Sequence, residues 1–193
     1  MNIAFTGTHL TGKTTLLNDF SKHIASVGED SHLHGCSFDY ITGIARRIIK
    51  RGFPLNKDGN VYSYINYIND QLEEEKRMIT DIFISDRTIL SALAYATTNK
   101  ELPRPFIPDY LIQMIENVWL LEKQRYDLYL YFPIEFPMTG ADRVHPADDE
   151  YRKKIDVTIH RFLEQYNVHH IHISGSQEER LDTLVSIIPG KIK

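Results

Sequence analysis

The loop at residues 7–14, GTHLTGKT, constrains the fold of this chain more than any other feature of the sequence. It matches the pattern G-x-x-x-x-G-K-[ST]. An apolar run at residues 2–6 precedes the loop, and apolar positions recur at helical spacing from residue 13 to about residue 27. This order of strand, loop and helix predicts a turn whose backbone N–H groups surround phosphates at the positive end of a helix dipole.

The chemistry of the loop assigns roles to its last two side chains. Lys13 is expected to reach the β- and γ-phosphates of a nucleotide, and the Thr14 hydroxyl to coordinate Mg²⁺. The alternative is an ordinary glycine-containing turn with a surface lysine. The residues predicted to bind the nucleotide at this loop are Gly7, Thr8, His9, Leu10, Thr11, Gly12, Lys13, Thr14 and Thr15.

Strand patterns alternate with helix patterns along the rest of the chain. This alternation predicts an α/β fold: one domain over residues 1–193, with a doubly wound parallel sheet of about five strands and helices on both faces. The hydrophobic content of 42% and charged content of 25% suit a folded chain of this length. Further strands are expected at residues 32–38, 79–85, 126–132 and 168–174, and further helices at 40–51, 61–78, 87–98, 109–123, 149–166 and 177–188.

Charge and cysteine content exclude several classes of protein. The net charge of −4 lacks the excess of basic residues that is typical of proteins that coat nucleic acid. A local basic groove is still compatible with this charge. A single cysteine, Cys36, excludes an intrachain disulfide and fits a reducing compartment. The sequence starts without a signal-peptide pattern, and no apolar run reaches the roughly 20 residues of a membrane-spanning helix. We therefore predict a cytoplasmic protein, in the host cytoplasm if a phage encodes it, without a membrane partner.

Asp86 and Arg87 follow the apolar segment at residues 79–85. In an open parallel sheet, ligands bind outside the carboxyl ends of the strands. We therefore expect Asp86 to lie beside the phosphate loop, within reach of the Mg²⁺, and Arg87 to provide a cation on the acceptor side. The alternative is a helix cap followed by a solvated arginine.

Two segments resemble a known family. GTHLTGKTTLL at residues 7–17 and ISDRTILSALAY at residues 84–95 are similar to the P-loop nucleoside and nucleotide kinases. Thymidylate kinases carry a similar Asp-Arg pair before a Ser-x-x-Ala-Tyr helix. The first segment also resembles the ribosylnicotinamide kinase domain and related phage-encoded proteins. The resemblance implies an Mg²⁺- and ATP-dependent kinase that acts on a nucleoside- or nucleotide-type acceptor.

The resemblance also suggests which residues contact the acceptor. In the family, an acidic residue after the second strand lies near the acceptor hydroxyl, and an arginine on the next helix holds the acceptor. The matching positions here are Asp39, as base, and Arg46. Asp39 would equally suit the N-cap of the following helix. Arg87 and Tyr67 complete the predicted acceptor site, although core packing explains the Tyr67 ring as well.

A long Pro- and Gly-containing segment at about residues 133–150 is similar to the lid of deoxynucleoside kinases. Arg143 and Arg152 would then neutralise the transferring phosphoryl group when the lid closes. The alternative is a solvated loop before a charged helix. In the resembled kinases, the turn that corresponds to Ser174, Gly175 and Ser176 lies beside the adenine ring.

Other readings stay open at this level. The pairs His32/His34 and His170/His172 each face one side of a predicted strand, but a zinc site would need further ligands that the sequence does not show. The predicted partner is a small nucleoside or nucleotide. DNA and a second copy of the chain, as a homodimer, stay open as further partners. The alternative functions are a kinase acting on a hydroxymethylated base in DNA and a nucleotide-binding switch with little turnover.

Overall fold

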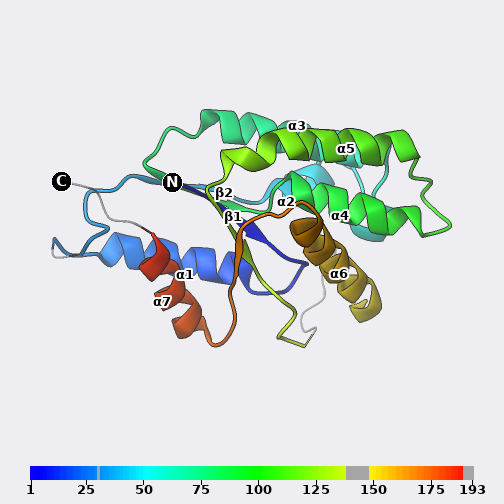
Figure 1. Cartoon of the computed structure of the whole chain (residues 1–193). Helices are drawn as coiled ribbons and strands as arrows, with labels where there is room; N and C mark the ends of the chain where they lie inside the picture. The colour runs from blue at the N-terminus through cyan, green and yellow to red at the C-terminus, as the bar shows by residue number, and fades with distance from the viewer. Residues whose placement is uncertain (30, 138–147, 189–193) are drawn as a thin grey trace.

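Five parallel strands form the centre of the computed structural model, which describes residues 1–29, 31–137 and 148–188. The strands lie in the order β2-β3-β1-β4-β5, and every neighbouring pair is parallel (Figure 1). This arrangement confirms the doubly wound sheet predicted from the sequence. The strands are β1 (Asn2–Thr6), β2 (Phe38–Ile41), β3 (Ile82–Asp86), β4 (Leu128–Tyr131) and β5 (His170–His172).

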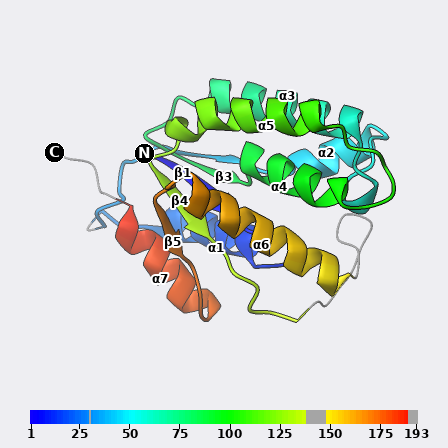
Figure 2. The ribbon, with the colours of Figure 1, turned by 45° about the vertical axis from the view of Figure 1, so that its right-hand side comes forward.

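Helices cover both faces of the sheet (Figures 1 and 2). One face carries α1 (Lys13–Ser26) and α7 (Gln177–Ile187), which lie side by side. The other face carries a larger group of helices, and two short 3-10 helices, η1 (Asn56–Asp58) and η2 (Lys123–Arg125), connect parts of it. The helices of that group are α2 (Ile44–Lys50), α3 (Val61–Arg77), α4 (Ile89–Lys100), α5 (Asp109–Glu122) and α6 (Asp149–Gln165).

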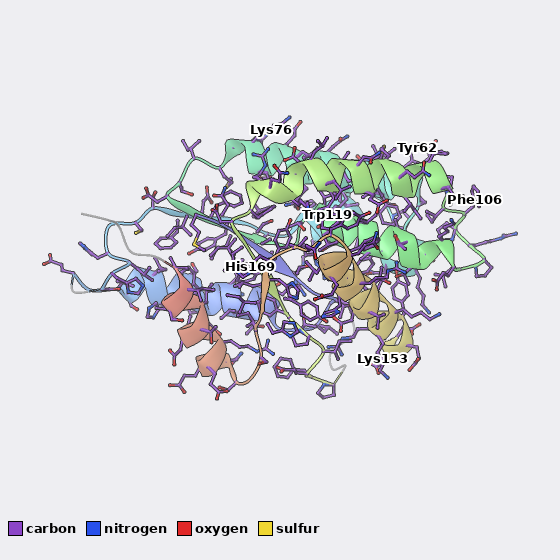
Figure 3. The ribbon with its side chains drawn as sticks, viewed as in Figure 1. Tyr62, Lys76, Phe106, Trp119, Lys153 and His169 are labelled. Atoms are coloured by element: carbon purple, nitrogen blue, oxygen red, sulfur yellow. The ribbon has the colours of Figure 1, made fainter. Side chains whose placement is uncertain are left out.

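Alternating strand residues supply two separate cores. Ile3 and Phe5 of β1 pack with the side chains of α1 and α7, whereas Ala4 faces the larger helical group. On that second face Trp119 of α5, labelled in Figure 3, packs edge-on against Phe162 of α6 with ring centroids 6.1 Å apart. Burial on both faces explains why β1, β3 and β4, the three central strands, are mostly apolar along their length. Within the described residues, no helix has the length and apolar character needed to cross a membrane.

The connections after β1 and β3 leave the sheet toward opposite faces. The chain passes from β1 into α1 on one face and from β3 into α4 on the other. Such a divergence opens a crevice at the carboxyl ends of neighbouring strands. The register pairs Phe5 with Asp86, so the end of β3 lies level with the start of the phosphate loop.

The second strand begins later than the sequence pattern predicted. A strand was expected at residues 32–38, but turns occupy residues 31–35 and β2 runs over Phe38–Ile41. Gly35 has a positive φ of 76°, which extended backbone does not allow, and pairing with β3 fixes the strand from Phe38 onward. The next helix accordingly starts at Ile44, after Gly43, rather than at residue 40.

Candidate active site

The phosphate loop lies between β1 and α1, as the motif predicted. Gly7 must be glycine, because its φ is 139° and a Cβ atom there would lie 2.5 Å from the Phe132 carbonyl oxygen. Gly12 caps α1 with a φ of 88°. Leu10 also has a positive φ, 57°. These turns bring the loop's backbone to the N-terminus of α1, where N–H groups and the helix dipole favour an anion.

Lys13 lies inside this loop rather than on the surface. Its ammonium donates hydrogen bonds to the Thr8 carbonyl oxygen and, at 2.8 Å, to Thr11 Oγ1. Burial and the neighbouring Arg87 guanidinium lower the pKa of Lys13 well below its usual value, while Asp86 opposes this shift. A bound phosphate would supply the negative charge that this buried cation needs. The reading of Lys13 as a surface lysine is therefore wrong.

Thr14 and Asp86 meet across the crevice. The Thr14 hydroxyl donates to Asp86 Oδ2 at 2.5 Å, although the two residues are 72 positions apart in the sequence. The other carboxylate oxygen, Oδ1, is buried and accepts no hydrogen bond from the described residues. A buried carboxylate oxygen without a donor suits a hard cation, and a hydroxyl beside it adds a second oxygen ligand. Thr14 and Asp86 therefore fit Mg²⁺.

Arg87 adopts a strained backbone conformation at the end of β3. Its φ is 94°, in a region that non-glycine residues rarely occupy, and such strain concentrates at functional sites. The Arg87 carbonyl oxygen accepts hydrogen bonds from Ser85 Oγ at 2.5 Å and Gln71 Nε2 at 3.3 Å. Thr88, not Asp86, caps α4, because its side chain accepts from Leu90 N. The helix-cap alternative for Asp86 is therefore wrong.

A cleft at the end of β1 and β3 brings most of the predicted residues together. It is lined by the phosphate loop, by residues 42–46 at the start of α2, and by the end of β3. The predicted residues that line it are Leu10, Thr11, Gly12, Lys13, Thr14, Thr15, Arg46, Tyr67, Asp86 and Arg87.

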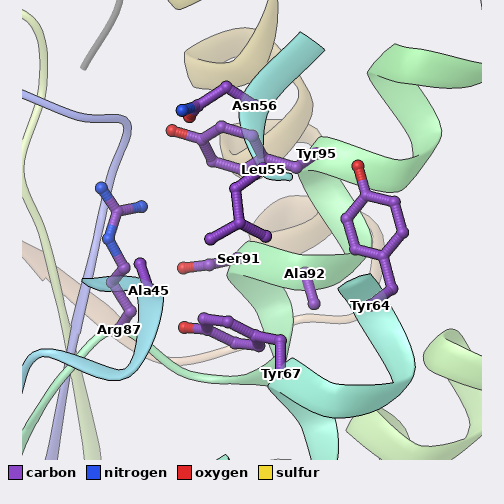
Figure 4. Close-up of a pocket in the computed structure, with 9 residues that line it drawn as sticks. All are labelled: Ala45, Leu55, Asn56, Tyr64, Tyr67, Arg87, Ser91, Ala92 and Tyr95. Atoms are coloured by element: carbon purple, nitrogen blue, oxygen red, sulfur yellow. The ribbon is translucent and has the colours of Figure 1, made fainter. Parts of the chain in front are cut away.

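A second, mainly apolar pocket adjoins this cleft and shares Ala45, Tyr67 and Arg87 with it (Figure 4). The hydroxyls of Tyr67 and Ser91 are buried and make no hydrogen bond with the described residues. Figure 4 shows both hydroxyls pointing toward the side on which Ala45 and Arg87 lie. The remaining lining residues are Leu55, Asn56, Tyr64, Ala92 and Tyr95. An apolar wall with a few unpaired polar groups is typical of a small-molecule site.

Arg152 does not occupy the position expected of a lid arginine. Its side chain is fully buried on α6, and each of its three nitrogen atoms donates to a backbone carbonyl. Nε donates to His9 O at 3.1 Å, Nη2 to Leu10 O at 2.9 Å and Nη1 to Phe136 O at 2.9 Å. In this structure Arg152 therefore holds the backbone of the phosphate loop.

Arg180, which the sequence did not single out, holds the loop from the α7 side. It is 2% exposed, and its Nη1 donates to Thr11 O at 2.8 Å. Its Nε donates to Gly175 O, and its guanidinium lies over the Phe136 ring, 4.7 Å from the centroid. No local signal identifies such a residue, because on the linear sequence it is one charge among several on α7.

A third cavity lies on this side of the phosphate loop. Leu10, Gly12 and Thr15 line one wall, and Phe136 and Arg180 another. The predicted adenine residues do not line it directly. Ser176 caps α7 in a capping box with Glu179, and Gly175 N donates to Glu135 Oε2 at 3.1 Å.

Two predicted residues lie elsewhere. Asp39 is inside β2, paired in register with Phe83, about three strand residues below Asp86, and it lines neither the cleft nor the apolar pocket. Its carboxylate accepts from Tyr40 N, and Gly43 caps α2, so Asp39 is not a helix cap either. Arg143 and the central part of the predicted lid lie outside the described residues.

The comparisons with known proteins agree with this geometry. The fold and the loop define a P-loop nucleotide-binding protein with a kinase-like architecture. Residues 2–180 match the family described as AAA domain, and the chain belongs to this family. No curated protein matches the sequence.

Several solved structures share the fold at low sequence identity. Deoxyadenosine kinase from M. mycoides has a TM-score of 0.65 and 14% identity, with 96% of this chain and 97% of that chain covered. The NadR protein in complex with NR has a TM-score of 0.67 and 15% identity, with coverage of 100% and 53%. Thymidylate kinase from Candida albicans has a TM-score of 0.63 and 16% identity, with coverage of 96% and 89%.

Proposed function

We propose that this protein is an Mg²⁺- and ATP-dependent kinase that transfers the γ-phosphoryl group to a nucleoside- or nucleotide-type acceptor. The observation that carries the proposal is the apolar pocket joined to the phosphate cleft through Ala45, Tyr67 and Arg87. A switch or motor needs the phosphate cleft alone. A phosphotransferase needs a second site whose ligand meets the phosphates at their outer end.

The phosphate side of the site is built for charge stabilisation. Lys13 would contact the β- and γ-phosphates, and Thr14 and Asp86 would hold the Mg²⁺. When bound, Mg²⁺ supplies neutralising charge to the phosphate oxygens. The cavity between Phe136 and Arg180 offers an aromatic ring and a guanidinium plane for the adenine. Transfer would then depend mainly on positioning and electrostatics.

The acceptor pocket suits a flat, partly polar ring. Tyr64 and Tyr95 provide aromatic surface, and Tyr67 Oη and Ser91 Oγ provide hydrogen bonds. Burial raises the pKa of Tyr67 above its usual value, so its hydroxyl is a neutral donor at physiological pH. A nucleoside base has a flat face for the aromatic surface and a hydrogen-bonding edge for the two hydroxyls. The nucleotides named for the similar structures, dCMP and dATP among them, carry bases of this kind and support the same class.

The charges at the junction favour an acceptor that already carries a phosphate. Arg46 and Arg87 line it, and Asp86 is the only carboxylate among the described residues lining the cleft or the pocket. Because Asp39 lies elsewhere, the described part of the chain lines this junction with no second carboxylate that could act as a base. A phosphate acceptor is ionised at neutral pH and needs no base, so a nucleoside monophosphate fits this junction best.

The surface of α2 argues against a DNA acceptor. The cations of α2 and its C-cap are Arg46, Arg47, Lys50 and Arg51. Of these, Arg47 pairs with Glu74 at 3.0 Å and Arg51 with Asp70 at 2.9 Å. Two of the four cations are thus committed to α3 and are less available for a DNA backbone.

A coupled assay of ADP release tests the proposal. Nucleosides, nucleoside monophosphates, ribosylnicotinamide and DNA with hydroxymethylated bases are offered with Mg²⁺ and ATP. We expect a nucleoside monophosphate to raise turnover most, and Lys13→Ala to reduce that turnover about a hundredfold or more while leaving the circular dichroism spectrum unchanged. If no acceptor raises ADP release above the Lys13→Ala background, the kinase proposal is wrong and the low-turnover switch is favoured.

A further inference from the structure

Three histidine rings from two elements meet at the β5 edge of the sheet, away from the residues that line the phosphate cleft. His170 and His172 lie on β5, and His160 lies on α6. Each offers a ring nitrogen, and these atoms all lie within 4.8 Å of one another. The sequence pattern indicated only His170 and His172, because His160 joins them only when α6 packs against the sheet (Figure 2).

Strand geometry and a neighbouring ring hold the cluster together. His170 and His172 share one face of β5 because strand residues two apart point the same way, while Ile171 packs in the core beneath α1 and α7. Tyr131 of β4 contacts all three rings, with centroid distances of 5.0 to 6.2 Å. The contacts of Ile171 and Tyr131 therefore fix the positions from which the three imidazoles approach one another.

The hydrogen bonds around the cluster present a metal-binding nitrogen. His170 Nδ1 lies 2.8 Å from Val168 O, so Nδ1 carries the proton and Nε2 keeps its lone pair. A backbone carbonyl on the far nitrogen is the usual partner of a metal-bound histidine. On the open side, Glu164 Oε1 lies 3.7 Å from His170 Nε2 and 3.9 Å from His160 Nε2.

The two distances from Glu164 are close to those of a tetrahedral site, whereas the three ring nitrogens, within 4.8 Å of one another, would draw closer around an ion. Ligand atoms about 2.0–2.1 Å from a zinc ion lie roughly 3.4 Å from one another. The carboxylate needs to move only a few tenths of an ångström toward the two nitrogens, and Glu164 and His160 share one turn of a surface helix at i and i+4.

We propose that His160, His170 and His172 bind a divalent transition metal of the zinc class, with Glu164 or water as the fourth ligand. Imidazole nitrogens with a carboxylate suit Zn²⁺ better than the oxygen-seeking Mg²⁺, so this site and the Thr14–Asp86 site select different ions. The metal would join the end of α6 to the edge strand β5. Its role is structural, because none of the three histidines lines the phosphate cleft or the apolar pocket.

Zinc binding to the purified chain, without nucleotide, tests this site. Competition with a chromophoric chelator is expected to give one Zn²⁺ per chain, and Zn²⁺ should raise the Tm. His170→Ala and His172→Ala should each weaken binding about a hundredfold and abolish the rise in Tm. His169→Ala is the matched control, because His169 is an exposed neighbour immediately before β5 and does not belong to the cluster (Figure 3).

Cobalt provides a second readout that does not depend on stability. Co²⁺ bound by three imidazoles and a carboxylate should give the visible absorption bands of a tetrahedral site, and His160→Ala should remove them. The proposal is overturned if the folded wild-type chain binds no Zn²⁺. It is equally overturned if the cluster variants bind Zn²⁺ as tightly as His169→Ala, which would place the ion elsewhere.

Discussion

Asp86 shows how one side chain can serve two partners. One carboxylate oxygen accepts from Thr14, and the other is buried without a hydrogen bond from the described residues. A carboxylate in this state costs free energy until a cation reaches it. A bound cation would satisfy this oxygen, which supports the proposed Mg²⁺ site.

Asp86→Asn is expected to weaken Mg²⁺-dependent turnover much more than nucleotide binding. The amide keeps the shape and the contact with Thr14 but removes the charge that attracts the metal, whereas the loop backbone supplies most phosphate contacts. Titrating Mg²⁺ in the ADP-release assay should show a higher half-saturating concentration and a kcat about a hundredfold lower. Asp182→Asn on α7 is the control. A variant whose Mg²⁺ dependence equals that of the control would contradict the metal assignment.

At the scale of elements, two helices far along the chain shape a loop near residue 10. Arg152 of α6 and Arg180 of α7 together donate to the carbonyls of His9, Leu10 and Thr11. Guanidinium groups from two helices thus hold three carbonyl oxygens of the loop. The loop's conformation thus depends on the docking of α6 and α7 as well as on its own glycines.

Replacing Arg152 with Met tests this positioning role. The thioether keeps part of the side-chain volume but removes the guanidinium hydrogen bonds to three carbonyls. We therefore expect the free energy of unfolding to fall by about 3 kcal/mol in urea titrations. The KM for ATP should rise more than kcat falls. Lys153→Met, one residue along on the exposed side of α6, should change neither. Normal stability together with a hundredfold loss in kcat alone would instead support direct contact with the transferring phosphoryl group.

The sequence predicted those parts of the site that depend on local pattern. The glycine spacing of the phosphate loop identified Lys13 and Thr14, and the end of an apolar strand identified Asp86. The alternation of patterns predicted the succession of strands and helices along the chain. The burial of Arg152 and Arg180, and the convergence of His160 on β5, depend on which helix packs beside which strand. The second strand was predicted to start at residue 32, which is wrong. Its boundary is set by pairing with β3, and this pairing cannot be recognised from residues 32–38 alone.

At the scale of the whole molecule, Glu75 connects three parts of the fold beneath the site. It is 2% exposed on α3, and its Oε1 accepts from Gln71 Nε2 at 2.7 Å and from Tyr126 Oη at 2.5 Å. Gln71 in turn holds the Arg87 carbonyl. Burial raises the pKa of Glu75, although hydrogen bonds from Tyr126 and Gln71 oppose the shift.

This raised pKa makes stability depend on pH. The folded state binds a proton at Glu75 more tightly than the unfolded state, so the free energy of unfolding falls as pH rises from about 4.3 through the pKa of the folded state. Glu75→Gln removes this titration while keeping the shape. In urea titrations across pH 4 to 8, the stability of the variant relative to wild type should increase with pH over that window and then level off. Parallel profiles would contradict the prediction.

The position of β1 has a consequence for synthesis on the ribosome. β1 lies in the middle of the sheet between β3 and β4, yet it is made long before either. At about 5–20 residues per second, Leu128 follows Ile3 by on the order of ten seconds. Both edges of this apolar segment stay uncovered until β3 is made, and the β4 edge stays uncovered throughout that interval. Such exposure invites aggregation or binding of a chaperone. The loop that binds phosphate is thus among the first segments translated and among the last to acquire its shape.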